Sequence, residues 1–89
     1  MSDAQVQHTI AQLVPEGAHV LDLGCGDGAL LQHLITTRRC TGYGIEIDDD
    51  NVLACVRRGV NVLQLNLHEG LKAFQDQSFD VVLQIDTLQ

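Results

Sequence analysis

The sequence predicts an α/β fold in which helices flank a parallel β-sheet. Short aliphatic runs alternate with amphipathic segments along the chain, and this alternation is typical of parallel strands joined by crossover helices. A glycine-rich loop at 24–28 follows the first aliphatic run, and an acidic residue, Glu46, ends the second. In open α/β sheets, ligands bind at the carboxyl ends of the strands, so both features indicate a binding protein.

The composition limits the classes of function. The 89 residues make one domain, and 45% hydrophobic with 19% charged residues is typical of a globular protein. Twelve acidic against five basic residues give a net charge of −7. Such a surface repels phosphate groups, so we expect neither a nucleic-acid partner nor a membrane partner.

The chain shows no sign of export or of a metal centre. Its first residues lack the basic and apolar regions of a signal peptide, and no apolar run approaches the roughly 18 residues that span a bilayer. A cytoplasmic protein is therefore expected. The histidines and cysteines have no metal-ligand spacing, and free thiols are expected at Cys25, Cys40 and Cys55.

The first half of the chain contains two helices and two strands by its hydrophobic periodicity. An amphipathic helix is predicted at 3–13, and Pro15 and Gly17 end it. The elements that follow are a buried strand at 18–23, the loop at 24–28, a helix at 29–37 and a strand at 43–47.

The second half begins with the best-marked helix, at 49–58. Asp48 is a good N-cap, and Gly59 stands where a left-handed C-terminal glycine belongs. We expect a strand at 60–65, mostly loop over 66–78 with one helical turn around 71–74, and a strand at 80–85. This order of elements predicts a parallel sheet with right-handed crossovers.

The glycine loop is a ligand-binding device. Gly24 and Gly26 lack a Cβ, so the backbone can turn tightly and approach a bound molecule. The helix that starts near Ala29 presents unpaired N–H groups at its positive end. Asp22, near the end of the strand, can organise the loop or meet a cation such as the amino group of a methionine moiety.

Two classes of cofactor fit this loop. Gly24-x-Gly26-x-x-Ala29 satisfies the dinucleotide fingerprint, which makes NAD(P) or FAD one alternative. The carboxylate of Asp22 would lie unfavourably close to a pyrophosphate, whereas S-adenosylmethionine carries a sulfonium and an ammonium but no phosphate. Gly28 widens the loop beyond what pyrophosphate needs. Both features favour S-adenosylmethionine.

The next two strands supply further candidates. Glu46 and its neighbour Ile47 end the second strand, where an acid can accept both ribose hydroxyls of either cofactor. Asn66 and Leu67 follow the third strand, where a side-chain carbonyl and a backbone N–H can bind the adenine edge. Cys25 is interpreted as a small residue within the cofactor loop. No residue is identified as a general base.

Three segments resemble class I S-adenosylmethionine-dependent methyltransferases. Residues 20–28 resemble their first motif, residues 42–48 their second, and residues 78–82 the start of their fourth strand. The chain is more closely similar to the MetW family of methionine biosynthesis, at 27–31, 42–47, 66–71 and 87–89 and through the pair Asn51-Val52.

The resemblance implies a Rossmann-like sheet and S-adenosylmethionine as cofactor. It implies a methyltransferase-like protein, leaning towards an enzyme, with homoserine O-acyltransferase as a partner. Residues 1–89 would form one domain that is incomplete at its C-terminus, the N-terminal portion of the methyltransferase fold. Its open sheet edge would then be covered by a partner or a second copy. The alternatives are a non-catalytic regulatory partner of the acyltransferase and an NAD-binding fragment.

The resemblance also assigns roles within the site. Three glycines would line the methionine and ribose part of the cofactor, Glu46 would hold the ribose, and the segment after the third strand would hold the adenine. The glycines are Gly24, Gly26 and Gly28, and the adenine residues are Asn66 and Leu67.

Overall fold

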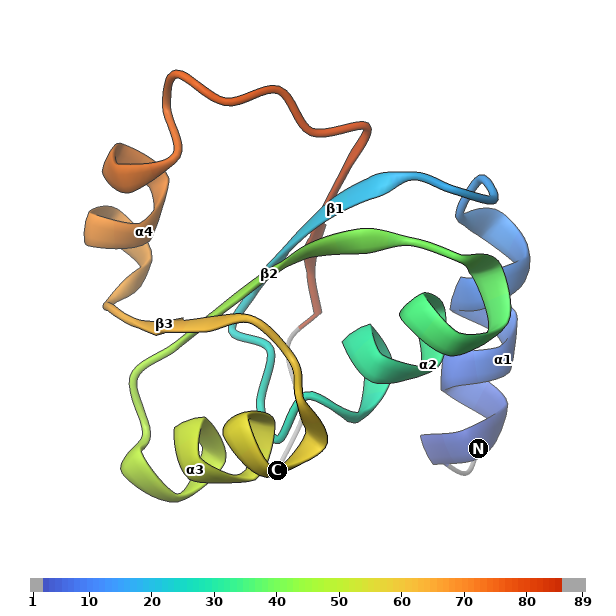
Figure 1. Ribbon diagram of the computed structural model, residues 1–89, viewed down its shortest axis with the longest axis horizontal. Helices are drawn as coiled ribbons and strands as arrows, with labels where there is room; N and C mark the ends of the chain where they lie inside the picture. The colour runs from blue at the N-terminus through green and yellow to red at the C-terminus, as the bar shows by residue number, and fades with distance from the viewer. Residues whose placement is uncertain (1–2, 86–89) are drawn as a thin grey trace.

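Helices and strands alternate along the chain in the computed structural model, which describes residues 3–85 (Figure 1). The elements are α1 (Asp3–Leu13), β1 (His19–Leu23), α2 (Ala29–Arg38), β2 (Thr41–Glu46), α3 (Asp49–Arg58), β3 (Val62–Gln64), α4 (Leu67–Ala73) and β4 (Val81–Gln84). The resemblance at 87–89 lies outside the described residues.

All the strands are parallel, in the order β3-β2-β1-β4. This arrangement confirms the predicted fold class. The predicted strands lie within a few residues of the observed ones; β3 is shorter than expected, and β2 begins at Thr41 rather than at residue 43.

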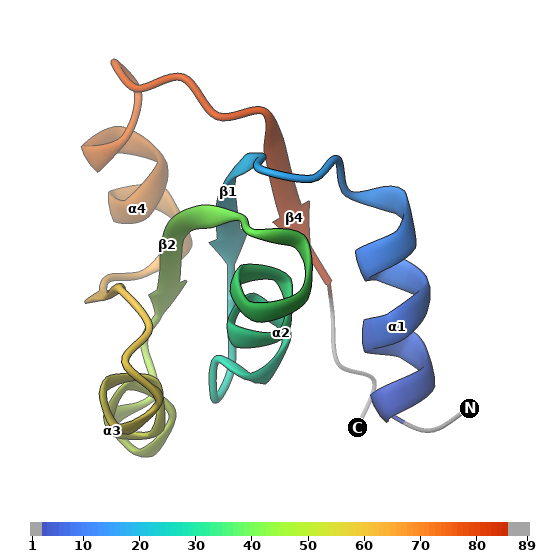
Figure 2. The ribbon, with the colours of Figure 1, turned by 45° about the vertical axis from the view of Figure 1, so that its right-hand side comes forward.

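The sheet separates two layers of hydrophobic core. Successive residues of β1 point to opposite faces, so Val20 joins one core and Leu21 the other. The core around Val20 also contains Leu31 and Leu34 of α2. The core around Leu21 contains Phe74, which follows α4. Figure 2 shows α1 and α4 on opposite sides of the sheet.

The prediction that residues 66–78 are mostly loop is wrong for their first half, which forms α4. A capping box starts this helix: Glu69 N donates to Asn66 Oδ1 at 2.8 Å, and Asn66 N donates to Glu69 Oε1 at 3.1 Å. The Asn-x-x-Glu pattern was visible in the sequence, but Gly70 weakens helical propensity there. Gly70 instead allows close packing, since a Cβ at that position would lie 2.8 Å from Ile45 Cγ2.

The glycine loop crosses the end of the neighbouring strand. Gly24 N and Cys25 N both donate to Ile45 O, at 2.8 and 3.0 Å. These two hydrogen bonds fix the loop at the carboxyl end of β2. The strands β3 and β4 form the two edges, where Leu63 and Val82 are exposed. Within residues 3–85, no helix is long and apolar enough to cross a membrane.

Candidate functional site

A cleft of about 910 Å³ opens at the carboxyl ends of the strands, which is within the size range of cofactor sites, roughly 300–1,000 Å³. The glycine loop, the end of β2, the start of α4 and one face of α1 line it. Eight of the nine predicted site residues lie there: Asp22, Gly24, Cys25, Gly26, Glu46, Ile47, Asn66 and Leu67.

The ninth predicted residue, Gly28, is not among the residues that line the cleft. It faces α3, where a Cβ would lie 2.9 Å from Cys55 Sγ. Gly24 and Gly26 differ from it, because a Cβ on either would meet nothing within 4 Å. All three have positive φ, of 72°, 60° and 83° in chain order, which favours glycine. The loop therefore has one side towards the cleft and another packed on α3.

The carboxylate of Glu46 ties the glycine loop to the turn after β2. Its Oε1 accepts from Gly26 N at 2.8 Å, and its Oε2 accepts from Ile47 N and Asp48 N, each at 3.0 Å. A carboxylate has about four acceptor positions, so these bonds leave room for one more. Glu46 can therefore accept one ribose hydroxyl rather than the two predicted, unless one of its hydrogen bonds to the backbone is released.

We predict that Glu46→Gln weakens binding of S-adenosylhomocysteine about tenfold and lowers the free energy of unfolding by about 2 kcal/mol. The amide nitrogen cannot accept a hydrogen bond, so at least one backbone N–H loses its partner. Calorimetric titration and urea unfolding measure the two effects. Asp50→Asn removes the same charge from an exposed residue in the first turn of α3; it should leave the affinity unchanged and lower the free energy of unfolding by less than about 1 kcal/mol. Equal behaviour of the two variants would contradict the prediction.

Asp22 places a carboxylate in an apolar setting at the base of the cleft. Its side chain is only 3% exposed and makes no hydrogen bond within the described residues. Every fully buried side-chain oxygen or nitrogen in those residues has a partner, so the Asp22 oxygens reach the open space of the cleft. Burial and, second to it, the carboxylate of Glu46 raise the pKa of Asp22 to about 6. A cationic ligand group beside Asp22 would favour the ionised form of this carboxyl and lower its pKa again.

Asn66 and Leu67 border the other end of the cleft. The Asn66 amide oxygen already caps α4, so the expected contact of this oxygen with an adenine amine would have to share it with Glu69 N. Leu67 is 42% exposed and offers apolar surface.

The structure adds cleft residues that the sequence reasoning missed. From α1 come Val6, Gln7 and Ile10, and from α2 comes Leu30. The amphipathic pattern of residues 3–13 was recognised, but a pattern does not show which part of an apolar face remains at a cleft. Only the packing of α1 against α2 settles that.

Cys25 lines the cleft, but its thiol points into the core. Its Sγ lies 3.7 Å from Cys55 Sγ, and burial above all raises the pKa of Cys25 well above its usual value. A thiol that stays protonated is a poor nucleophile, which agrees with the interpretation of Cys25 as a small residue of the loop. The cysteines are free, as expected. No three metal-ligating side chains gather anywhere between residues 3 and 85.

Comparison with known proteins assigns this arrangement to a family. Residues 4–89 match the family described as methionine biosynthesis protein MetW. The chain belongs to the MetW family. A relative from Rhodopirellula baltica, the bifunctional methionine biosynthesis protein MetXA/MetW, is 38% identical over 91 residues, which are 93% of this chain and 15% of the relative.

A second relative is the fatty-acid O-methyltransferase of Mycolicibacterium smegmatis. It is 35% identical over 88 residues, or 93% of this chain and 32% of the enzyme. The chain thus spans a third or less of the curated relatives it matches.

Solved structures agree with the family. An RNA methyltransferase from Salinibacter ruber, in complex with S-adenosyl-L-homocysteine, has a TM-score of 0.68 and 30% identity, over 78% of this chain and 52% of that one. An S-adenosylmethionine-dependent methyltransferase from Archaeoglobus fulgidus has a TM-score of 0.72 and 27% identity, over 91% and 37%. These neighbours favour the methyltransferase interpretation of a MetW protein over the NAD-binding alternative.

Proposed function

We propose that this MetW chain binds S-adenosylmethionine in the cleft at the carboxyl ends of β1 and β2, as part of a methyltransferase-like protein of methionine biosynthesis. The observation that carries the proposal is the buried Asp22 carboxylate, which faces the cleft without a hydrogen-bond partner in residues 3–85. A cofactor with an ammonium and a sulfonium suits this acid, whereas a pyrophosphate would add repulsion.

The other cleft residues fit the remaining parts of the cofactor. The open sides of Gly24 and Gly26 admit close approach of a methionine moiety to the backbone. Glu46 keeps one acceptor position for a ribose hydroxyl. Asn66 and Leu67 follow β3, which lies on the other side of β2 from Asp22 of β1, and they would bind the adenine. Family membership and the methyltransferase neighbours support this assignment.

When bound, the cofactor supplies a methyl group activated by its sulfonium. The residues described here bind and orient the cofactor; none of them is proposed to move a proton from an acceptor. A role in methyl transfer would therefore rest on positioning.

We predict that calorimetric titration gives one binding site for S-adenosylhomocysteine and for S-adenosylmethionine, and no heat with NAD. The buried Asp22 carboxylate favours a ligand that places an ammonium group beside it and disfavours a pyrophosphate. Binding of NAD in place of the sulfur-containing ligands would overturn the proposal.

We also propose homoserine O-acyltransferase as the partner of this MetW protein. The support is the Rhodopirellula relative, which carries MetXA and MetW in one chain. Fusion of two activities is a natural arrangement for proteins that work together. Gel filtration of the two purified proteins, mixed and separate, tests this, and independent elution at micromolar concentration would contradict it. Self-association through an open sheet edge stays a prediction, which the same column tests over a range of concentrations.

A further inference from the structure

The side of the glycine loop that faces away from the cleft rests on α3. We propose that Cys55 and Arg58 of α3 are positioning residues that hold the loop in its binding conformation and so set the cofactor affinity. Neither residue lines the cleft. The inference deepens the proposed function, on which its affinity effect rests, and it assigns a role to the thiol pair that the sequence reasoning did not foresee.

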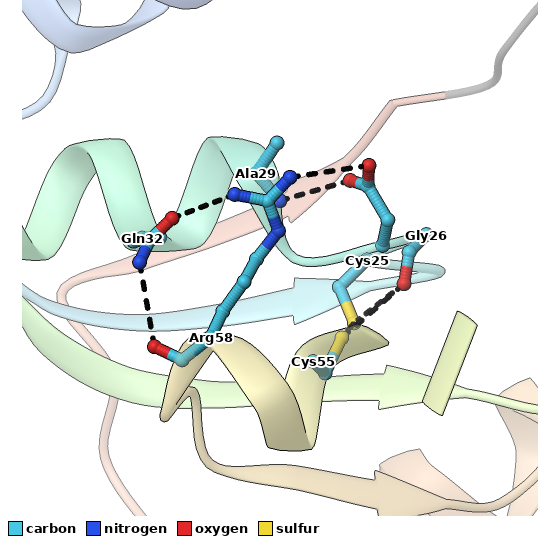
Figure 3. Close-up of polar contacts among 7 residues, drawn as sticks. Cys25, Gly26, Ala29, Gln32, Cys55 and Arg58 are labelled. Atoms are coloured by element: carbon cyan, nitrogen blue, oxygen red, sulfur yellow. Dashed lines mark hydrogen bonds and ion pairs between the residues drawn. The ribbon is translucent and has the colours of Figure 1, made fainter. Parts of the chain in front are cut away.

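Cys55 supports the loop at two points. Its side chain is fully buried, and its Sγ donates to Gly26 O at 3.3 Å. The same sulfur occupies the space that a Cβ on Gly28 would need, since it would lie 2.9 Å away. Figure 3 shows Cys55 reaching from α3 to Cys25 and Gly26. Both backbone groups of Gly26 are thus held: its N–H donates to Glu46, and its carbonyl accepts from Cys55.

Arg58 supports the loop at a third point. Its Nη2 lies 3.5 Å from Asp27 Oδ2, and its Nη1 donates to Gln32 Oε1 at 2.7 Å. Asp27 in turn accepts from Ala29 N at 3.0 Å, and this bond satisfies an N–H at the start of α2. Gly28, the N-cap of α2, has no side chain for this task. Figure 3 shows the Arg58 side chain lying across to Gln32 on α2.

The spacing on α3 explains why these two residues act together. Positions 55 and 58 are three apart and lie on the same face of a helix. Arg57, between them, is exposed and has no ion pair within the described residues. It therefore matches Arg58 in charge and neighbourhood but lacks the contact, which makes it a suitable control.

Two variants and their controls test the proposal in the purified protein. We expect Arg58→Gln to raise the dissociation constant of S-adenosylhomocysteine about threefold, a modest effect because the ion pair with Asp27 is partly exposed. Arg58→Lys should restore most of the affinity, and Arg57→Gln should leave it unchanged. Cys55→Ala should raise the constant about fivefold, and Cys55→Ser, which keeps a donor, should raise it less.

Hydrogen exchange of the ligand-free protein gives a readout independent of binding. The amides of Gly26 and Ala29 should exchange faster in Arg58→Gln and Cys55→Ala than in the wild type and in Arg57→Gln. A merely structural role would lower the melting temperature without changing the dissociation constant measured well below it, and that result overturns the proposal. Unchanged exchange at both amides also overturns it. If the wild type binds no S-adenosylhomocysteine, the proposed function fails and the affinity effect with it, while the exchange rates still decide whether α3 supports the loop.

Discussion

Alanine at position 44 is expected to weaken S-adenosylhomocysteine binding at least about tenfold and to lower the free energy of unfolding by about 2 kcal/mol. Gly44 lies in β2 directly beneath the glycine loop, paired with Asp22 of β1. A Cβ at this position would lie 2.5 Å from Cys25 Sγ and 2.9 Å from Cys25 Cβ. The second atom is next to the backbone, so turning the Cys25 side chain cannot relieve the overlap, and the loop itself has to move.

The cause is tested by rescue and by a matched control. The double variant Gly44→Ala with Cys25→Gly removes both overlapping atoms and should recover much of the lost affinity. Gly70→Ala adds a methyl group on the opposite face of the sheet, 2.8 Å from Ile45 Cγ2. It should cost comparable stability, measured by urea unfolding, with less than about a twofold change in dissociation constant. The prediction fails if Gly70→Ala and Gly44→Ala weaken binding equally.

The fold was largely predictable because the chain marks its elements with local signals. Asp48 caps α3 and Gly59 ends it in the left-handed conformation, as their residue types indicate. The buried strand β1 was equally clear from its aliphatic run. The first half of α4 was missed, and only a turn around 71–74 was expected, because the signal for its start is a polar capping box. Hydrophobic periodicity, on which the prediction relied, is weak in so short a segment.

The residues of the site were predictable for a different reason. In a parallel sheet the ends of neighbouring strands meet at one edge, so Asp22 and Glu46 had to lie near each other once the sheet was accepted. The role of Gly28 could not be predicted in the same way. Its spacing suggests a wide cofactor loop, but its contact is with Cys55, 27 residues later in the sequence, across the packing of α3. A contact between residues so far apart in the chain produces no periodic pattern in the sequence.

Binding of S-adenosylhomocysteine is expected to weaken about tenfold when the pH falls from 7 to 5, because Asp22 then takes up a proton. Burial, followed by the Glu46 carboxylate, raises the pKa of Asp22 from 3.8 to about 6 in the ligand-free protein. If the ligand ammonium binds only the ionised acid, the apparent affinity scales with the ionised fraction. That fraction is roughly nine-tenths at pH 7 and one-tenth at pH 5 for a pKa near 6.

The same shift sets the sign of the effect on stability. The folded protein holds the Asp22 proton more tightly than the unfolded chain, so the group stabilises the fold fully below pH 3.8, and this contribution is lost as the pH rises through about 6. A rise of the Asp22 pKa from 3.8 to about 6 corresponds to about 3 kcal/mol of free energy. Ionisation of Asp22 is thus unfavourable without a ligand, and a bound ammonium offsets that cost. Low pH favours the empty fold, and neutral pH favours the complex.

The variant Asp22→Asn separates the titration of Asp22 from that of every other group, both in ligand binding and in stability. The variant should bind S-adenosylhomocysteine more weakly at pH 7, with a dissociation constant nearly independent of pH between 5 and 7. It should also lose the decline in ligand-free stability over the rise from pH 4 to 7, as followed by urea unfolding. None of the histidines of the described residues lines the cleft, and all of them are shared by the two proteins. If the dissociation constant of Asp22→Asn depends on pH as strongly as that of the wild type, another group titrates. Asp22 would then not bind the ligand ammonium.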